Sequence, residues 1–201
     1  MTLLSFCLLL LQFIPSTERY APYSSVGISI ARPSNPDYFY DFWKNGYGVT
    51  YNRTFPSADP LGWMVAGDMF WYGLDQERVF QRYSIDAGST ALSGGSAVVL
   101  TASAYRTYRI PDYTSTVPYL FTGVGLALSE IFGTTITYPF HTTEQKMQTG
   151  VGIFIPIGII VETKYRETTN IIIIGKYDFG IPILAPSLSG KASISVAFRL
   201  D

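Results

Sequence analysis

Apolar and polar residues alternate along most of this chain with a period of two, which is typical of β-strands whose two faces meet different surroundings. In residues 190–200, the even positions from Ala192 to Leu200 are apolar, and the odd positions are small, polar or charged. On this basis eight segments are predicted to be strands: 24–31, 46–54, 62–73, 95–108, 117–129, 145–155, 157–167 and 190–200. The chain is therefore expected to fold as an all-β domain.

The connections between these segments alternate in length, with 14, 7, 21, 8, 15, 1 and 22 residues. Transmembrane β-barrels have brief turns at the periplasmic rim and long loops outside. The pattern predicts an eight-stranded antiparallel up-and-down transmembrane β-barrel with short periplasmic turns and long extracellular loops. The β-prone run from Ile171 to Ile174 lies inside the last long connection. A barrel of ten strands is therefore an alternative to one of eight.

Charged residues in these segments gather on the small and polar faces. A charge that faces lipid at mid-bilayer costs about 2–4 kcal/mol, so the apolar faces are expected to contact lipid. Glu162 is expected to pair with Lys164 or Lys191, because buried charges need partners. Arg53 lies on the apolar face, close to a turn from which it can reach the headgroups. The predicted lumen-facing polar network consists of Asp68, Lys146, Glu162, Lys164, Lys191 and Arg199.

Aromatic residues recur at a spacing that fits the thickness of a membrane. Trp63 and Trp71 are eight residues apart on one face, and Tyr47 and Phe55 repeat this spacing on the preceding segment. At about 3.3 Å per residue and a tilt near 40°, such a pair spans roughly 20 Å of the membrane normal. These four residues are predicted to form an aromatic girdle; the alternative is that they are core aromatics of a soluble sheet.

Three stretches carry motifs of a known family: VGISIARPSNPDYFYDFWKNGYG at 26–48, VPYLFTGVGL at 117–126 and TGVGIFIPIGIIVETKY at 149–165. They resemble the strands of bacterial outer-membrane β-barrel domain proteins. The resemblance implies an OmpA-like or opacity-type eight-stranded barrel in the bacterial outer membrane, with outer-membrane lipid and the outer-membrane assembly machinery as partners. Such chains usually end on an aromatic residue that this machinery recognises, whereas here Phe198 lies three positions before the last residue, Asp201.

The amino-terminal segment and the composition limit the possible functions. Residues 3–14 form an apolar run too short to span a bilayer, so 1–20 are expected to be a signal peptide and 21–201 the outer-membrane β-barrel domain. The 14 Lys and Arg residues nearly balance 15 Asp and Glu residues, which argues against a nucleic-acid partner. The single cysteine is Cys7, so the barrel domain has no thiol chemistry.

Candidate catalytic chemistry is sparse. His141 is the only histidine, and no serine lies within two positions of it, so a role as the base of a lipid-modifying enzyme is less favoured than an exposed loop position. No catalytic residue, cofactor or metal site is predicted. The aromatic residues of the first long connection either lie at the headgroup level or bind an extracellular ligand; they are Tyr38, Tyr40, Phe42 and Trp43.

The expected function is a non-enzymatic structural, adhesive or surface-recognition role in the bacterial outer membrane, with loops that can bind an extracellular ligand. One alternative is a small-solute or ion pore whose path runs through the Glu162 network. Another is a soluble lipocalin-like periplasmic binding barrel, which requires the apolar faces to point inward.

Overall fold

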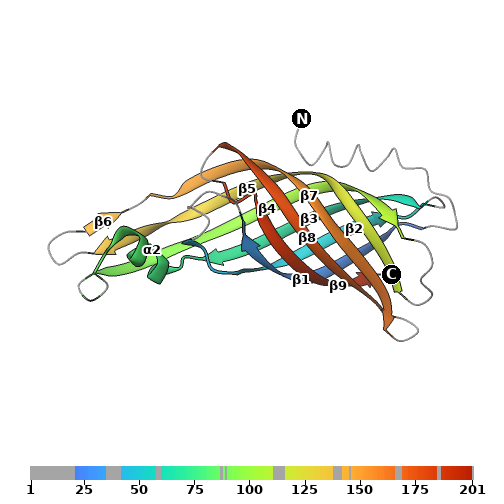
Figure 1. The fold of residues 1–201 in the computed structure, drawn as a ribbon, viewed down its shortest axis with the longest axis horizontal. Helices are drawn as coiled ribbons and strands as arrows, with labels where there is room; N and C mark the ends of the chain where they lie inside the picture. Colours follow the sequence, from blue (N-terminus) through green and yellow to red (C-terminus); the bar gives the residue numbers. More distant parts are fainter. Residues whose placement is uncertain are drawn as a thin grey trace.

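The computed structural model describes residues 21–34, 42–57, 60–86, 88, 90–110, 116–137, 142–144, 146–165, 169–184 and 187–200. Its main strands are β1 (Tyr23–Pro33), β2 (Gly46–Phe55), β3 (Leu61–Gly73), β4 (Ala91–Arg109), β5 (Thr116–Thr137), β7 (Gln148–Tyr165), β8 (Thr169–Leu184) and β9 (Lys191–Leu200). Each pairs antiparallel with the next, and β9 pairs with β1, which closes an eight-stranded barrel (Figure 1). The predicted fold class is confirmed.

Two short elements lie outside the ring of strands. The helix α2 (Gln76–Tyr83) is part of the connection between β3 and β4. The strand β6 (Thr142–Glu144) pairs with the last residues of β5. Both lie at the same end of the barrel (Figure 1). Among the described residues, no helix combines the length and the apolarity needed to cross a bilayer.

Two predicted strands are a single strand in the structure. Residues 148–155 of the predicted segment 145–155 and residues 157–165 of the predicted segment 157–167 both belong to β7, which continues through Pro156. Ile155 and Ile157 are both exposed, so the alternation keeps its phase across the proline, as it must in a continuous strand. The predicted one-residue turn was therefore wrong. The missing strand is β8, which contains the run from Ile171 to Ile174, and the ring has eight strands rather than ten.

With one exception, the shorter connections lie at one end of the barrel and the longer connections lie at the other. Residues 56–60, 110–115 and 166–168 connect strands at one end, and residues 34–45, 74–90 and 138–147 connect them at the other. The last connection, 185–190, is short, although it belongs to the end with the longer connections. By the usual organisation of membrane barrels, the end with α2 and β6 is extracellular and the other is periplasmic.

The outer surface of the barrel is apolar. Ile28 is 72% exposed, Ile194 is 64% exposed and Val49 is 54% exposed, whereas Ser193 and Ser195 are buried inside. The orientation expected from the sequence is therefore correct. This outcome removes the soluble lipocalin-like alternative, because the apolar faces point away from the barrel axis.

The lumen is filled by side chains in three levels. An extracellular apolar layer contains Trp43, Phe70, Tyr72, Val99, Phe154 and Leu188. A periplasmic apolar layer contains Met64, Tyr105, Phe121, Ile160, Ile172 and Ile174. Polar and charged side chains lie between these layers, because Asp68 separates Ala66 from Phe70 along β3. A barrel of this strand number is just wide enough for side chains to fill it.

Candidate functional sites in the lumen and at the extracellular end

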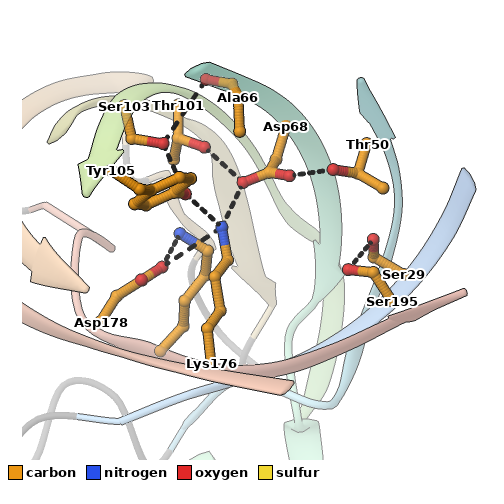
Figure 2. Close-up of polar contacts among 11 residues, drawn as sticks. Ser29, Thr50, Ala66, Asp68, Thr101, Ser103, Tyr105, Lys176, Asp178 and Ser195 are labelled. Carbon is orange, nitrogen blue, oxygen red and sulfur yellow. Dashed lines mark hydrogen bonds and ion pairs between the residues drawn. The ribbon is translucent and has the colours of Figure 1, made fainter. Parts of the chain in front are cut away.

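Four ionisable side chains meet inside the barrel and form the lumen charge cluster, which consists of Asp68, Lys176, Asp178 and Lys191. Each of them is at most 8% exposed. The Lys176 Nζ lies 2.6 Å from the Asp68 Oδ2 and 4.0 Å from the Asp178 Oδ2, and the Lys191 Nζ lies 2.7 Å from the same Asp178 oxygen. Acids and bases therefore alternate in one electrically neutral chain (Figure 2).

Hydroxyl groups from neighbouring strands contact Asp68 and Lys176, at one end of the cluster. Thr50 donates a hydrogen bond of 2.6 Å to the Asp68 Oδ1, and Thr101 donates one of 3.0 Å to the Asp68 Oδ2. Lys176 also donates to the Tyr105 hydroxyl at 3.3 Å. A buried charge is tolerated only when it is paired and hydrogen-bonded, and these contacts meet that requirement for Asp68.

Aromatic rings enclose the other end of the cluster. The Lys191 Nζ lies 5.3 Å from the centre of the Phe70 ring and 4.8 Å from the centre of the Phe154 ring, distances at which a cation is attracted to a ring face. Both rings belong to the extracellular apolar layer, and Tyr105 belongs to the periplasmic one. The cluster thus links β3, β8 and β9 inside the barrel, with an apolar layer between it and each mouth.

The structure brings only some of the predicted lumen residues together. Asp68 and Lys191 belong to the lumen charge cluster, but Glu162 and Arg199 form a separate pair near the periplasmic end, with the Arg199 Nη1 3.9 Å from the Glu162 Oε1. The Tyr23 hydroxyl donates to the Glu162 Oε2 at 3.1 Å. Glu162 therefore pairs with Arg199 rather than with Lys191, one of its two predicted partners, and Lys191 pairs with Asp178.

The other two lumen predictions had different outcomes. Lys146 is exposed and precedes β7, so its predicted lumen position was wrong. The error came from starting the strand at residue 145, where alternation was assumed before the strand begins. The side chain of Lys164 lies outside the described residues.

Lys176 and Asp178, the central residues of the cluster, were missed because β8 was interpreted as a loop. The signal was nevertheless present in the sequence. Tyr177, Phe179 and Ile181 alternate with the two charged residues, and in the structure all three are exposed while the charges are buried.

The predicted girdle residues lie at the two ends of the β2–β3 hairpin. Tyr47 is a cross-strand neighbour of Trp71, and Phe55 is a cross-strand neighbour of Trp63. Tyr47, Trp63 and Trp71 are 68%, 46% and 54% exposed. Phe55 is only 7% exposed, so a lipid-facing position for it was wrong. It is the last residue of β2, where alternation stops determining which way a side chain points.

The extracellular end carries an apolar depression, called here the extracellular crevice. It has a volume of about 510 Å³ and lies between α2, β4 and β5, with Phe42, Val79, Tyr83, Leu92, Ile136 and Lys146 among its lining residues. The helix α2 is fixed there by Asp75, which accepts a hydrogen bond from the Arg78 backbone N–H at 3.4 Å, and by Val79, which packs against Leu92 and Phe42. Tyr38, Tyr40 and His141 lie outside the described residues.

In the part of the chain that the structure describes, no group of three or more His, Cys, Asp or Glu side chains is placed to hold a metal ion. The two acids of the lumen charge cluster already have lysine partners at 2.6 and 2.7 Å.

Comparison with known proteins identifies the fold. No family model matches the sequence, and no curated protein matches it. The attachment invasion locus protein Ail of Yersinia pestis has a similar structure, with 12% identity over 89% of this chain and 97% of Ail, and a TM-score of 0.50. Ail in complex with the heparin analogue sucrose octasulfate gives the same values. Neisserial surface protein A matches over 89% of this chain and 96% of its own, with 12% identity and a TM-score of 0.48.

The closed ring and the apolar exterior define an eight-stranded transmembrane β-barrel of the outer-membrane type. The resemblance to OmpA-like and opacity-type barrels is confirmed at the level of the fold.

Proposed function

We propose that this protein is an integral barrel of the bacterial outer membrane with a non-enzymatic, surface-recognition role. The exposed apolar strand faces would anchor it in lipid, and the extracellular crevice would bind its partner. The observation that carries this proposal is the crevice itself, because a depression lined mainly by apolar and aromatic side chains is the usual form of a binding site.

The shape of the β4–β5 hairpin supports this role. The last residue of β3, Gly73, pairs with Ser96, but β4 and β5 remain paired as far as Ala91 and Thr137. Closing the barrel does not require this extension. A hairpin that overruns its neighbours and is covered by a helix is a rigid platform, and binding residues are commonly carried on such extensions of a stable scaffold.

Binding by intact cells would test the proposal. Cells that display the protein would be measured for retention on immobilised glycans and on extracellular-matrix proteins. Tyr83 is 58% exposed at the crevice, so Tyr83→Ala should reduce retention several-fold, and Lys146→Gln should do the same. Tyr108→Ala is the matched control, because Tyr108 is 45% exposed but lies near the periplasmic rim. Equal retention by all variants would contradict a recognition role for the crevice.

The pore alternative makes the opposite prediction. Two apolar layers and the lumen charge cluster fill the interior, which supports a barrel that does not conduct. Planar bilayers containing the protein should show no conductance, and Glu162→Gln should change nothing. Steady conductance that this substitution alters would establish a pore instead.

The absence of catalysis is also part of the proposal. A lipid-modifying barrel would need His141 as its base, so the protein should leave phospholipid and lipid A unchanged in a mass-spectrometric assay. Modification of either lipid that is lost in His141→Ala would make it an enzyme.

A further inference from the structure

Two arginines near the periplasmic end point outward rather than into the lumen. Arg53 shares the outward face of β2 with Tyr51, and its Nη1 donates to the Ser24 Oγ at 2.9 Å. The Ser24 Oγ in turn lies 3.0 Å from the Tyr51 hydroxyl. Arg53 is therefore held in place on the surface by a hydroxyl chain, and among the described residues no acid forms an ion pair with it.

The second arginine rests on a tryptophan. Arg106 is exposed on β4, and its Cζ lies 4.9 Å from the centre of the Trp63 ring, its cross-strand neighbour on β3. Arg53 pairs with Val65, the next residue along the same face of β3 after Trp63. The two guanidinium groups thus flank one strip of β3. They are called here the arginine patch, together with Trp63 and Ser24.

The described strands around this patch carry almost no negative charge. Within β1 to β4 as described, Asp68 is the only carboxylate, and it is buried in the lumen. The described residues of these strands therefore offer the two outward arginines no acidic partner. Cations on the lipid side of a barrel are costly at the midplane and cost little near the interface, where they can reach lipid phosphates.

From this arrangement we propose that the arginine patch binds the phosphate headgroup of an anionic phospholipid in the periplasmic leaflet. The guanidinium fork matches phosphate oxygens in a bidentate manner. The Trp63 ring attracts the Arg106 guanidinium and holds it at this place on the outer surface. Tryptophan itself belongs at the level of the headgroups.

A lipid is the fitting source of this phosphate because the patch continues into the apolar exterior. Val26, two residues beyond Ser24 along β1, is 44% exposed, and Tyr51 is 47% exposed. A bound headgroup would therefore have its acyl chains beside exposed apolar side chains, whereas a free phosphate ion would use only the arginines. The inference rests on the membrane position in the proposed function but not on the extracellular crevice.

Lipid selectivity measured by electron spin resonance would test the site. The protein is inserted into phosphatidylcholine vesicles with spin-labelled phosphatidylglycerol or spin-labelled phosphatidylcholine, and heat-modifiable gel mobility confirms that every variant is folded. Because a basic residue near an anionic surface contributes about 1 kcal/mol, Arg53→Gln and Arg106→Gln should each lower the preference for phosphatidylglycerol about five-fold. The double variant should show almost no preference.

Further measurements distinguish a specific headgroup site from non-specific electrostatic attraction of anionic lipid. Arg106→Lys keeps the charge but loses the fork, so a site predicts reduced selectivity, whereas unchanged selectivity would overturn the proposal. Trp63→Leu should act like Arg106→Lys. Millimolar inorganic phosphate should not displace the labelled lipid, and displacement would show a site for the free ion instead. Loss of folded mobility in the unmodified protein would instead count against the membrane position itself.

Discussion

Removing the central lysine of the lumen charge cluster should destabilise the barrel strongly. In Lys176→Met, Asp68 loses an ion pair of 2.6 Å and Asp178 loses a contact of 4.0 Å. Breaking a buried pair from one side costs about 3–5 kcal/mol, because the remaining charge stays buried without its partner. Asp68 keeps the hydrogen bonds from Thr50 and Thr101, so the cost should lie near the lower end, about 3 kcal/mol.

The assay is equilibrium unfolding in guanidinium chloride from vesicles, followed by tryptophan fluorescence. Lys146→Met is the matched control, because it makes the same substitution at an exposed lysine, and it should change the free energy of unfolding by less than about 0.5 kcal/mol. Adding Asp68→Asn to Lys176→Met removes the stranded charge and should recover at least half of the loss. If Lys176→Met unfolds like the control, the cluster is not a stabilising element and the reasoning is refuted.

Three other substitutions examine the remaining layers of the barrel. Ile28→Arg places a charge at mid-strand on the outer face, where Ile28 is 72% exposed. It should lower the free energy of unfolding by about 2–4 kcal/mol. The control Ser84→Arg, which adds the same charge beside α2, should cause no comparable loss. Leu188→Ala opens a cavity in the extracellular apolar layer, where Leu188 is 1% exposed, and should cost about 2–5 kcal/mol in the same assay; a smaller loss would mean that this layer is loosely packed. Gly125→Leu would push a side chain into the Phe154 ring and should lower the free energy of unfolding by about 1–3 kcal/mol. If this clash causes the loss, adding Phe154→Ala should partly restore stability.

The faces of the strands were predictable because alternation follows directly from the pleat. Positions such as Ile194 and Ser195 needed only the rule that successive side chains point to opposite sides and that lipid excludes charge. Proline was the misleading signal. Pro156 was interpreted as a turn, although Ile155 and Ile157 keep one phase through it, and the resulting extra strand hid the absence of β8.

The pairing inside the lumen was less accessible to sequence reasoning. Lys176 and Asp68 are separated by 108 positions in the chain, and their meeting depends on how far each strand is shifted along its neighbours. Alternation tells which residues point inward but contains no information about this stagger, which sets the depth of every inward side chain. Glu162 illustrates the point, because it faces inward yet lies too near the periplasmic rim to reach Lys191.

The length of β5 has a consequence for what the protein can touch. The strand has 22 residues, so at about 3.3 Å per residue and a tilt near 40° it rises roughly 55 Å along the membrane normal, about twice the height of the apolar band. The surplus lies mainly on the side of Ile136 and α2. A molecule bound there would lie well above the bilayer surface. At that height the protein could contact an opposing cell or a matrix fibre without bending of either membrane.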